Sequence, residues 1–524
     1  MSNVQTTRAH VNTVYPVVDL FAGPGGLGDG FASLVDQNAR YLFSGVVSIE
    51  REPHSYQTLM LRHFFRFFPF GEVPDAYYEF LSGVISREDL YSLYPDAYQY
   101  AKSSALRLSL GPDTRAAIRE IIKDRLAGAK KWALVGGPPC QAYSLVGRSR
   151  MKGDPNFEKD ERHNLYLEYL RIIADHRPPI FVMENVKGLL SATIEGKSAI
   201  NRIVRDLQNP SSAISGAPTN LNYRLYSLTE AEKAQGDVDP KLFLVRAEDY
   251  GIPQARHRMF IVGVRGDLSV RPTIMRKSTA PTVHETIGSL PKIRSGLSRE
   301  MDSREAWLSA IRQLASLNIR DQLNGAEYAG QVAYKLQLES LMAMLPPDDK
   351  SSTRYTVERP KHAVLRGIYD DRLTVLTSHE ARGHMASDLR RYLYAATFAQ
   401  EVGRSPKLAD FPASLLPDHQ NVHEGRRGKM FSDRFRVQLA DNVSTTITSH
   451  ISKDGHYFIH YDPVQCRSLT VREAARLQTF PDNYFFAGPR TEQYHQIGNA
   501  VPPKLAEQIA GIVAEVLASV TVGR

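Results

Sequence analysis

The chain has 524 residues, more than a single hydrophobic core usually supports, so we expect two domains. Its 42% hydrophobic and 23% charged residues are ordinary for a globular protein in water, and no apolar run is long enough to span a bilayer. The polar start from Met1 to Arg8 lacks the apolar core of a secretory signal, which predicts a protein that stays inside the cell. Two cysteines exclude a disulfide framework and a cysteine-based zinc cluster, and the net charge of +8 suits a polyanionic partner without proving one.

Four short apolar runs each end in residues that could carry a function. The first, Tyr15–Phe21, enters a glycine-rich turn, after which a helix is expected from about Asp29 to Val35. The other three runs are 42–49, 132–135 and 180–183, which end at Glu50, at Gly136–Cys140 and at Glu184. Buried strands that alternate with helices predict a parallel α/β sheet, whose ligands bind beyond the carboxyl ends of the strands.

The texture of the sequence changes at about residue 266. From 266 to 464, Pro, Ser, Arg and His are frequent and the strand–helix alternation is lost, which predicts a separate domain. Helical patterning returns over 469–478 and 502–517. The α/β domain is therefore expected to be discontinuous, made of 1–265 together with 465–524, with 62–129 as an insertion of unknown role.

The turn from Phe21 to Gly28 follows a strand and opens a helix, where glycine allows close backbone approach to a ligand. Glu50, at the end of the next strand, is placed to accept hydrogen bonds from a ribose. Together they predict a nucleoside cofactor site. Dinucleotide enzymes use similar turns, and a turn needed only for packing is the alternative.

Three further patterns suggest reaction chemistry. Cys140 follows the rigid pair Pro138–Pro139, which would hold its thiol in a fixed place, although most lone cysteines are small buried hydrophobes. Glu184 ends the next strand, where its carboxylate could meet the same ligand. Arg256 and Arg258 are two residues apart, so in a strand both guanidinium groups would lie on one face.

In order, these motifs resemble those of the DNA (cytosine-5)-methyltransferases of prokaryotic restriction-modification systems or of the orphan type. The matching segments are Asp19–Gly26, Gly137–Gln141, Glu184–Val186, Gln254–Arg258, Arg467–Glu473 and Gln496–Pro503. The resemblance thins between 266 and 464, where the family places its variable target-recognition domain. It implies a Rossmann-like sheet of the class I S-adenosylmethionine-dependent methyltransferases, with a separate, smaller and irregular target-recognition domain.

The resemblance also implies the roles of individual residues. Cys140 would add to C6 of cytosine, Glu184 would supply a proton at N3, and Arg258 would contact O2, with Arg256 in support. S-adenosylmethionine would bind against a larger set: Asp19, Phe21, Gly23, Gly25, Gly26, Glu50, Arg51, Asp113, Pro139 and Asn499. Arg51 stands where the family often has an adenine-stacking side chain, and Asp113 is equally well explained as a turn or helix-cap residue.

The expected partner is double-stranded DNA, from which the target cytosine would be flipped into the site. The segment 142–163 is composed like a loop that closes on DNA, and the basic runs 426–429 and 434–436 are either DNA contacts or solvated surface. We expect a monomer in the cytoplasm, associated with the nucleoid, with a restriction endonuclease as a possible separate companion. No metal is expected, since the spacing of His379 and His384 is one residue too long for a zinc-protease helix.

Three alternatives remain at this point. The same chemistry on a transfer RNA is the nearest, although the Cys-Phe-Thr tripeptide of that branch is absent. A catalytically silent nucleic-acid-binding regulator would be expected to lack Cys140 or Glu184, and both are present. A nicotinamide-dependent oxidoreductase would explain the glycine turn and Glu50 but not the motifs around Cys140 and Glu184.

Overall fold

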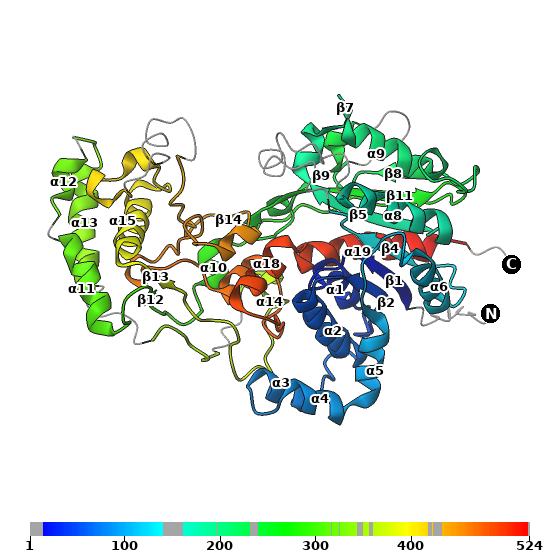
Figure 1. Cartoon of the computed structure of the whole chain (residues 1–524), viewed down its shortest axis with the longest axis horizontal. Helices are drawn as coiled ribbons and strands as arrows, with labels where there is room; N and C mark the ends of the chain where they lie inside the picture. The colour runs from blue at the N-terminus through cyan, green and yellow to red at the C-terminus, as the bar shows by residue number, and fades with distance from the viewer. Residues whose placement is uncertain are drawn as a thin grey trace, which may run out of the picture.

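The computed structural model describes residues 14–139, 161–194, 196–230, 239–315, 317–323, 325–342, 349–355, 360–417, 422 and 432–521. Within these residues the centre is an eight-stranded sheet of order β3–β2–β1–β4–β5–β11–β8, with β9 paired to β11 (Figure 1). The strands in that order are Ala105–Arg107, Phe43–Glu50, Tyr15–Leu20, Ala133–Gly136, Ile180–Val186, His257–Arg265 and Tyr223–Tyr226, with β9 at Leu244–Arg246. The first five are parallel, and β11 is antiparallel to its neighbours.

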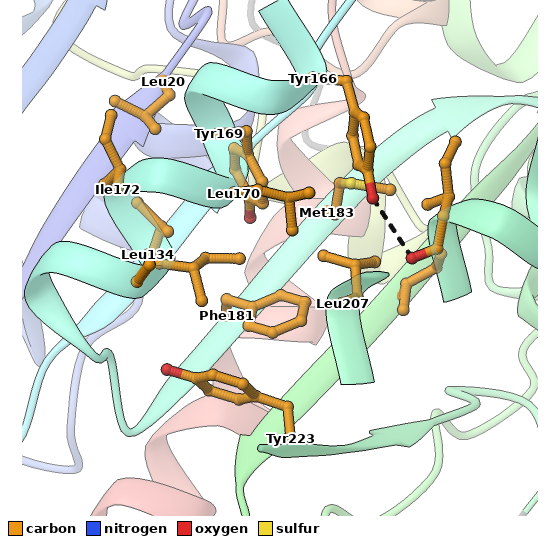
Figure 2. Packing of buried hydrophobic residues seen from close by; sticks show 14 of the residues in the cluster. Leu20, Leu134, Tyr166, Tyr169, Leu170, Ile172, Phe181, Met183, Leu207 and Tyr223 are labelled. Atoms are coloured by element: carbon orange, nitrogen blue, oxygen red, sulfur yellow. Dashed lines mark hydrogen bonds between the residues drawn. The ribbon is translucent and has the colours of Figure 1, made fainter. Parts of the chain in front are cut away.

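Helices cover both faces of this sheet, which makes a three-layer α/β structure. On one face lie α6 (Arg115–Leu126), α8 (Glu161–His176) and α9 (Ala199–Gln208), and on the other lie α1 (Gly26–Ser33) and α19 (Pro503–Ser519). Figure 2 shows the first core, in which Tyr169 and Leu170 of α8 pack with Leu134 and Phe181 of the sheet. This layering confirms the predicted fold class.

Two element boundaries differ from the sequence expectation for physical reasons. The first helix begins at Gly26, not at Asp29, because Gly25 adopts φ +103° as its N-cap and lets the turn pass directly into the helix. The strand that begins at Ile180 continues to Val186, since pairing with β11 reaches from Ile180 to Val186. Glu184 therefore lies within a paired strand and not after one.

The region 62–129 is structurally mixed. It contains the end of α2 (Pro53–Phe67), then α3 (Asp75–Leu81), α4 (Arg87–Leu93) and α5 (Pro95–Ser104). It then supplies β3 at the edge of the main sheet and α6 on one of its faces. The part that lies outside the sheet layers is α3–α5, which we call the helical insertion.

The region between β11 and α17 (Val471–Leu477) holds a helical cluster, seen at the left of Figure 1. Its larger helices are α11 (Arg304–Ala315), α13 (Ala329–Met342) and α15 (Ala386–Val402), which share one core around Trp307 and Tyr392. Shorter elements are α10 (Val283–Ile287), α12 (Ile319–Gln322) and α14 (Ala363–Arg366), with the paired strands β12 (Gly296–Leu297) and β13 (Gly383–His384). The two-domain division at 266 and 464 stays a prediction.

The last part of the chain returns to the sheet. α17 (Val471–Leu477) begins with a capping box between Thr470 and Glu473, and α18 (Arg490–Asn499) leads into α19. Two more pairs of short strands are β6 (Thr193–Ile194) with β7 (Lys197–Ser198), and β10 (Gln254–Ala255) with β14 (Ser444–Thr445). Among the helices that the structure describes, none combines the length and apolar character that a membrane span requires.

Candidate active site

A cavity of about 1450 Å³ opens at the carboxyl ends of β1, β2, β4 and β5. Pockets for drug-sized ligands run to about 1,000 Å³, so this one has room for a nucleoside and a second group. The predicted site residues on its lining are Asp19, Phe21, Gly23, Glu50, Arg51, Asp113, Pro139, Glu184 and Asn499. The structure therefore brings most of the predicted set around one space.

The glycine turn forms one wall of the cavity. Phe21, Gly23 and Gly25 all have positive φ angles, of 59°, 58° and 103°. Such a conformation strains a phenylalanine, and strained backbone is concentrated at functional sites. Gly26 packs against the backbone of Val501, since a Cβ at position 26 would lie 2.4 Å from the Val501 carbonyl oxygen. The turn is thus packed tightly against the segment that follows Asn499.

Glu50 is held in place by backbone amides. Its Oε2 accepts a hydrogen bond from the Gly23 amide at 2.8 Å, and its Oε1 accepts one from the Glu52 amide at 2.7 Å. Each carboxylate oxygen has a second acceptor position, so the group can still accept from a ligand. The contact with Gly23 ties the end of β2 to the glycine turn of β1.

Asp19 supports the turn from behind as well as bordering the cavity. It is buried, and its Oδ2 has no hydrogen-bond partner among the described residues. Burial raises the pKa of Asp19 to about 8, while the Gly28 amide lowers it and the charge of Glu50 raises it. A Cβ at Gly28 would lie 2.5 Å from Asp19 Oδ2, so only glycine lets the backbone at position 28 approach the carboxylate this closely.

Glu184 and Arg258 form an ion pair at the cavity. Arg258 Nε lies 3.2 Å from Glu184 Oε1, because β11 pairs Phe260 with Glu184 and so places Arg258 two residues along the same face. Burial raises the pKa of Glu184, and the charges of Arg258 and Arg256 lower it. Gly137 makes room for the carboxylate, since a Cβ there would lie 2.9 Å from Oε2.

Arg256 has other hydrogen-bond partners than Arg258, although the charges of both act on Glu184. The expectation that both guanidinium groups lie on one face stays a prediction. Arg256 falls between β10 and β11, and its buried side chain donates to the carbonyl oxygens of Ile447 at 2.9 Å and Gly498 at 3.2 Å. Arg256 thereby joins the segments that contain Ile447 and Gly498, and neither Arg256 nor Arg258 is itself on the cavity lining.

Cys140 and residues 141–160 lie outside the described residues, so the predicted thiol and most of the expected closing loop 142–163 have no structural account. The two residues that precede Cys140 are described. Asn185 is buried, and its Nδ2 donates to the carbonyl oxygen of Pro138 at 3.2 Å. Pro139, the next residue, lines the cavity.

Asn499 is exposed at the end of α18 and is supported by residues that the sequence interpretation missed. Gln478 Nε2 donates to the carbonyl oxygens of Ile497 at 2.7 Å and Ala500 at 2.9 Å. Gln254 donates in turn to Gln478 Oε1 at 2.6 Å. Gln254 belongs to the motif Gln254–Arg258, but its neighbours in the sequence do not distinguish a buried glutamine that orders a turn from a glutamine on the surface.

Other side chains on the cavity lining were also missed. Glu168 of α8 is buried and pairs with Arg115 of α6, with Nη2 to Oε1 at 2.5 Å. Glu492 and His495, on one face of α18, lie on the rim. Asp113 is exposed on the lining, one residue before Thr114, which is the N-cap of α6, so Asp113 is not itself the cap.

The remaining sequence candidates have different surroundings. Residues 426–429 lie outside the described residues, and Phe435, between Arg434 and Arg436, is buried in the helical core. His379 and His384 are both buried in separate hydrogen-bonded settings and share no helix. The described residues contain no cluster of His, Cys, Asp and Glu arranged to hold a metal ion.

A mainly parallel sheet with a glycine turn, an acidic residue that ends the second strand and a ligand cavity at the strand ends are typical of Rossmann-like α/β enzymes that bind a nucleoside. The sequence model of the family described as C-5 cytosine-specific DNA methylase matches residues 115–515, and the chain belongs to this family. It is thus an enzyme of the DNA (cytosine-5-)-methyltransferase type, and the fold is that of its class.

Curated relatives agree. The chain is 31% identical to the type II methyltransferase M.Bpa9945I of Bacillus paralicheniformis, over 96% of this chain and 99% of that protein. It is 26% identical to M.DdeI of Desulfomicrobium norvegicum, over 72% and 71% of the two chains. It is 25% identical to M.AgeI of Thalassovita gelatinovora, over 94% and 97%. Both of these are also named type II methyltransferases.

Proposed function

We propose that this enzyme transfers a methyl group from S-adenosylmethionine to C5 of a cytosine flipped out of a specific double-stranded DNA sequence, through a covalent bond between Cys140 and C6. The observation that carries the proposal is the ion pair between Arg258 and Glu184, whose carboxylate lies on the lining of the same cavity as the glycine turn. In this proposal the two side chains are the proton donor and the cation for a pyrimidine, beside the site of a nucleoside. The names of the relatives support a role in protecting host DNA within restriction-modification.

The cofactor side of the cavity fits S-adenosylmethionine. α1 begins without a side-chain cap among the described residues, so amides of its first turn are suited to the cofactor carboxylate. Glu50 would accept from the ribose hydroxyls, with Phe21, Gly23, Asp113, Pro139 and Asn499 around the rest. When bound, the cofactor supplies an electrophilic methyl group on its sulfonium.

The base side is built from Glu184 and Arg258. The raised pKa of Glu184 favours the protonated carboxyl, which can donate to N3 of cytosine as charge develops on the ring. Arg258 would meet the adjacent O2, and its pairing with Glu184 keeps both groups in position. Arg256 acts one step away, by holding the backbone near Asn499.

Cys140 is the nucleophile in this proposal. Its thiolate forms a bond to C6, the C5–C6 double bond shifts its electrons to C5, and N3 gains a proton from Glu184. C5 then forms a bond to the methyl carbon while the bond between that carbon and the sulfonium sulfur breaks, which leaves a neutral thioether. Water takes the proton from C5, and cleavage of the bond between the Cys140 sulfur and C6 restores the aromatic ring and the free thiolate. The N3 proton returns to Glu184.

The proposed substrate is double-stranded DNA. Because C6 is hidden in the base stack of a duplex, the cytosine must be flipped out before it can reach the thiol. The expected monomer and a separately acting endonuclease remain part of the proposal. Residues that read the target sequence are assigned to 266–464 as a whole.

The test is transfer of tritiated methyl from S-adenosylmethionine to unmethylated plasmid DNA and to bulk transfer RNA, with base-resolution mapping of 5-methylcytosine. Label at cytosine in one short DNA motif is expected, and Cys140→Ser should abolish turnover while cofactor binding stays close to wild type. Label only in RNA would move the activity to that branch. Normal turnover by Cys140→Ser would remove the covalent mechanism.

A further inference from the structure

The helical insertion packs against chain that comes much later in the sequence. Its aromatic core includes Leu373, with Tyr355 and Phe485 packed against it. The rings of Phe80 in α3 and Phe485 lie 5.0 Å apart. In Figure 1 the insertion lies at the lower edge of the molecule, and a coil of the olive region passes beside α3. The insertion therefore contacts both the 266–464 region and the C-terminal part.

Asp370 is the polar centre of this contact. Its Oδ2 accepts a hydrogen bond from the Tyr78 hydroxyl of α3 at 2.8 Å and one from Asn483 Nδ2 at 2.6 Å. Its backbone amide donates to the Tyr355 hydroxyl at 3.2 Å. One carboxylate oxygen thus joins the insertion to the segment after α17.

Arg372 makes a second attachment two residues further on. Its Nη2 lies 2.6 Å from Asp75 Oδ1, and its Nη1 donates to the carbonyl oxygen of Val73 at 2.5 Å. The guanidinium also lies over the Tyr78 ring, 4.4 Å from its centroid. The segment 366–373 is consequently fixed at two points to the start of the insertion.

Asn483 extends the connection to the cofactor site. Arg62 of α2 donates from Nη1 to Asn483 Oδ1 at 3.0 Å and from Nε to Asp29 Oδ1 at 2.8 Å. Asp29 belongs to α1, the helix that the glycine turn opens. All three side chains are buried, so the connection lies in a low-dielectric setting where hydrogen bonds hold geometry firmly.

We propose that the helical insertion is a brace that fixes segment 366–373 to the α1–α2 scaffold of the cofactor site, with Asp370 as its joint, and so positions the 266–464 region for DNA. Asp370 is a positioning residue, since it touches neither the cavity lining nor the reacting groups. Its effect on DNA rests on the proposed function, whereas the mechanical connection does not.

The primary test substitutes Asp370→Asn in the full-length enzyme. The new amino group would face either Tyr78 and Asn483, which both donate to Oδ2, or the Arg372 amide, which donates to Oδ1 at 3.0 Å. Either orientation removes hydrogen bonds that hold position 370, so the joint loosens. We expect the KM for unmethylated plasmid DNA to rise about tenfold, the effect of one charged hydrogen bond. The KM for S-adenosylmethionine should stay within about twofold, because the Arg62–Asp29 and Arg66–Asp29 pairs remain. Tyr78→Phe, which deletes a single hydroxyl, should act in the same direction more weakly.

A charge swap separates positioning from general destabilisation. Combining Asp370→Asn with Asn483→Asp reverses the donor and acceptor and restores the hydrogen bond, while the new carboxylate still accepts from Arg62. The double variant should recover most of the KM for DNA. Asp89→Ala is the matched control, since it removes the exposed Ser86–Asp89 cap of α4 inside the insertion without touching Asp370. Its KM for DNA should equal that of the wild type.

Hydrogen–deuterium exchange gives a readout that needs no substrate. Amides of 366–373 should exchange faster in Asp370→Asn than in the wild type, and at the wild-type rate in the double variant. Unchanged exchange and unchanged KM for DNA in Asp370→Asn, or an equal effect of Asp89→Ala, would overturn the brace. Absence of DNA methylation by the wild type would instead remove the proposed function, and the exchange comparison would still decide the mechanical connection.

Discussion

Glu184 illustrates how one side chain gains its chemistry from several segments. The strand β5 places its carboxyl at the cavity, Gly137 leaves it room, and Arg258 of β11 pairs with it. Burial opposes the charged form, so the pKa of Glu184 is raised despite the two nearby arginines. The acid form therefore persists to higher pH than in an exposed glutamate.

We expect Glu184→Gln to slow the single-turnover rate of methyl transfer by about 10²- to 10⁴-fold, the range of general acid catalysis. In the wild type the step that needs the acid form should slow as the pH rises through the pKa of Glu184. The glutamine variant should lose that limb of the pH–rate profile. Rapid-quench measurements over a pH series would check both.

Glu120→Gln, on the exposed face of α6, is the control for the loss of one carboxylate and should leave rate and profile unchanged. A Glu184→Gln enzyme with the wild-type rate and the same descending limb would contradict the assigned role.

At the scale of elements, the contact between α1 and α19 decides the shape of the cofactor side. A Cβ at Gly30 would lie 2.4 Å from Ala506 Cβ and 2.6 Å from the carbonyl oxygen of Pro503. Gly26, one turn earlier, approaches Val501 in the same way. Two glycines on one face thus allow the helices to meet at backbone distance, directly beside the turn and Asn499.

Gly30→Ala should therefore lower the free energy of unfolding by about 1–3 kcal/mol, as overpacking does in a filled core. Because α1 must shift away from α19, the KM for S-adenosylmethionine should also rise. Denaturant unfolding followed by circular dichroism measures the first effect, and steady-state kinetics the second.

Gly511→Ala is the matched control on α19, because a Cβ there meets nothing within 4 Å. That change should raise stability by about 0.5–1 kcal/mol through the helix preference of alanine. Equal destabilisation by both substitutions would show that the Gly30 contact is not the cause.

At the scale of the whole molecule, buried charges join the C-terminal segment to the 266–464 region. Arg467 and Glu473 are almost fully buried and pair at 2.6 Å, and Arg467 Nε also donates to the carbonyl oxygen of Ile293 at 3.1 Å. The Arg467 guanidinium holds the pKa of Glu473 well below its usual range against the opposing effect of burial. Because that pKa is depressed, this contribution to stability is present at neutral pH and is lost as the pH falls below the ordinary glutamate range.

Arg467→Met should lower the free energy of unfolding at pH 7 by about 3–5 kcal/mol, since it leaves Glu473 buried without its main partner. Adding Glu473→Leu should recover much of the loss, because the uncompensated charge is then gone. Urea unfolding of the two variants checks this. No loss in the single variant, or no recovery in the double one, would show that the pair does not stabilise the junction.

The local sequence was sufficient to predict the α/β class, the main strands of the sheet and nine of the residues on the cavity lining. Phe21, Glu50 and Glu184 each follow or end an apolar run, and such runs encode buried strands through local pattern alone. Parallel strands bring their carboxyl ends to one edge, so residues far apart in sequence had to converge. Family resemblance then supplied their roles.

Long-range contacts, by contrast, were decided only in the tertiary structure. Arg256 donates to the carbonyl oxygen of Ile447, 191 residues later along the chain. Gln478, at the end of α17, orders the turn of Asn499. Tyr78 of α3 meets Asp370, and Asp75 meets Arg372 at a separation of 297 residues. Such pairings depend on which surfaces the folded chain brings together, so they cannot be predicted from the residues next to each partner in the sequence. The sequence by itself determined the strands and the residue types at their ends, and the packing between distant segments determined which arginine pairs with Glu184 and what holds the cavity lining in place.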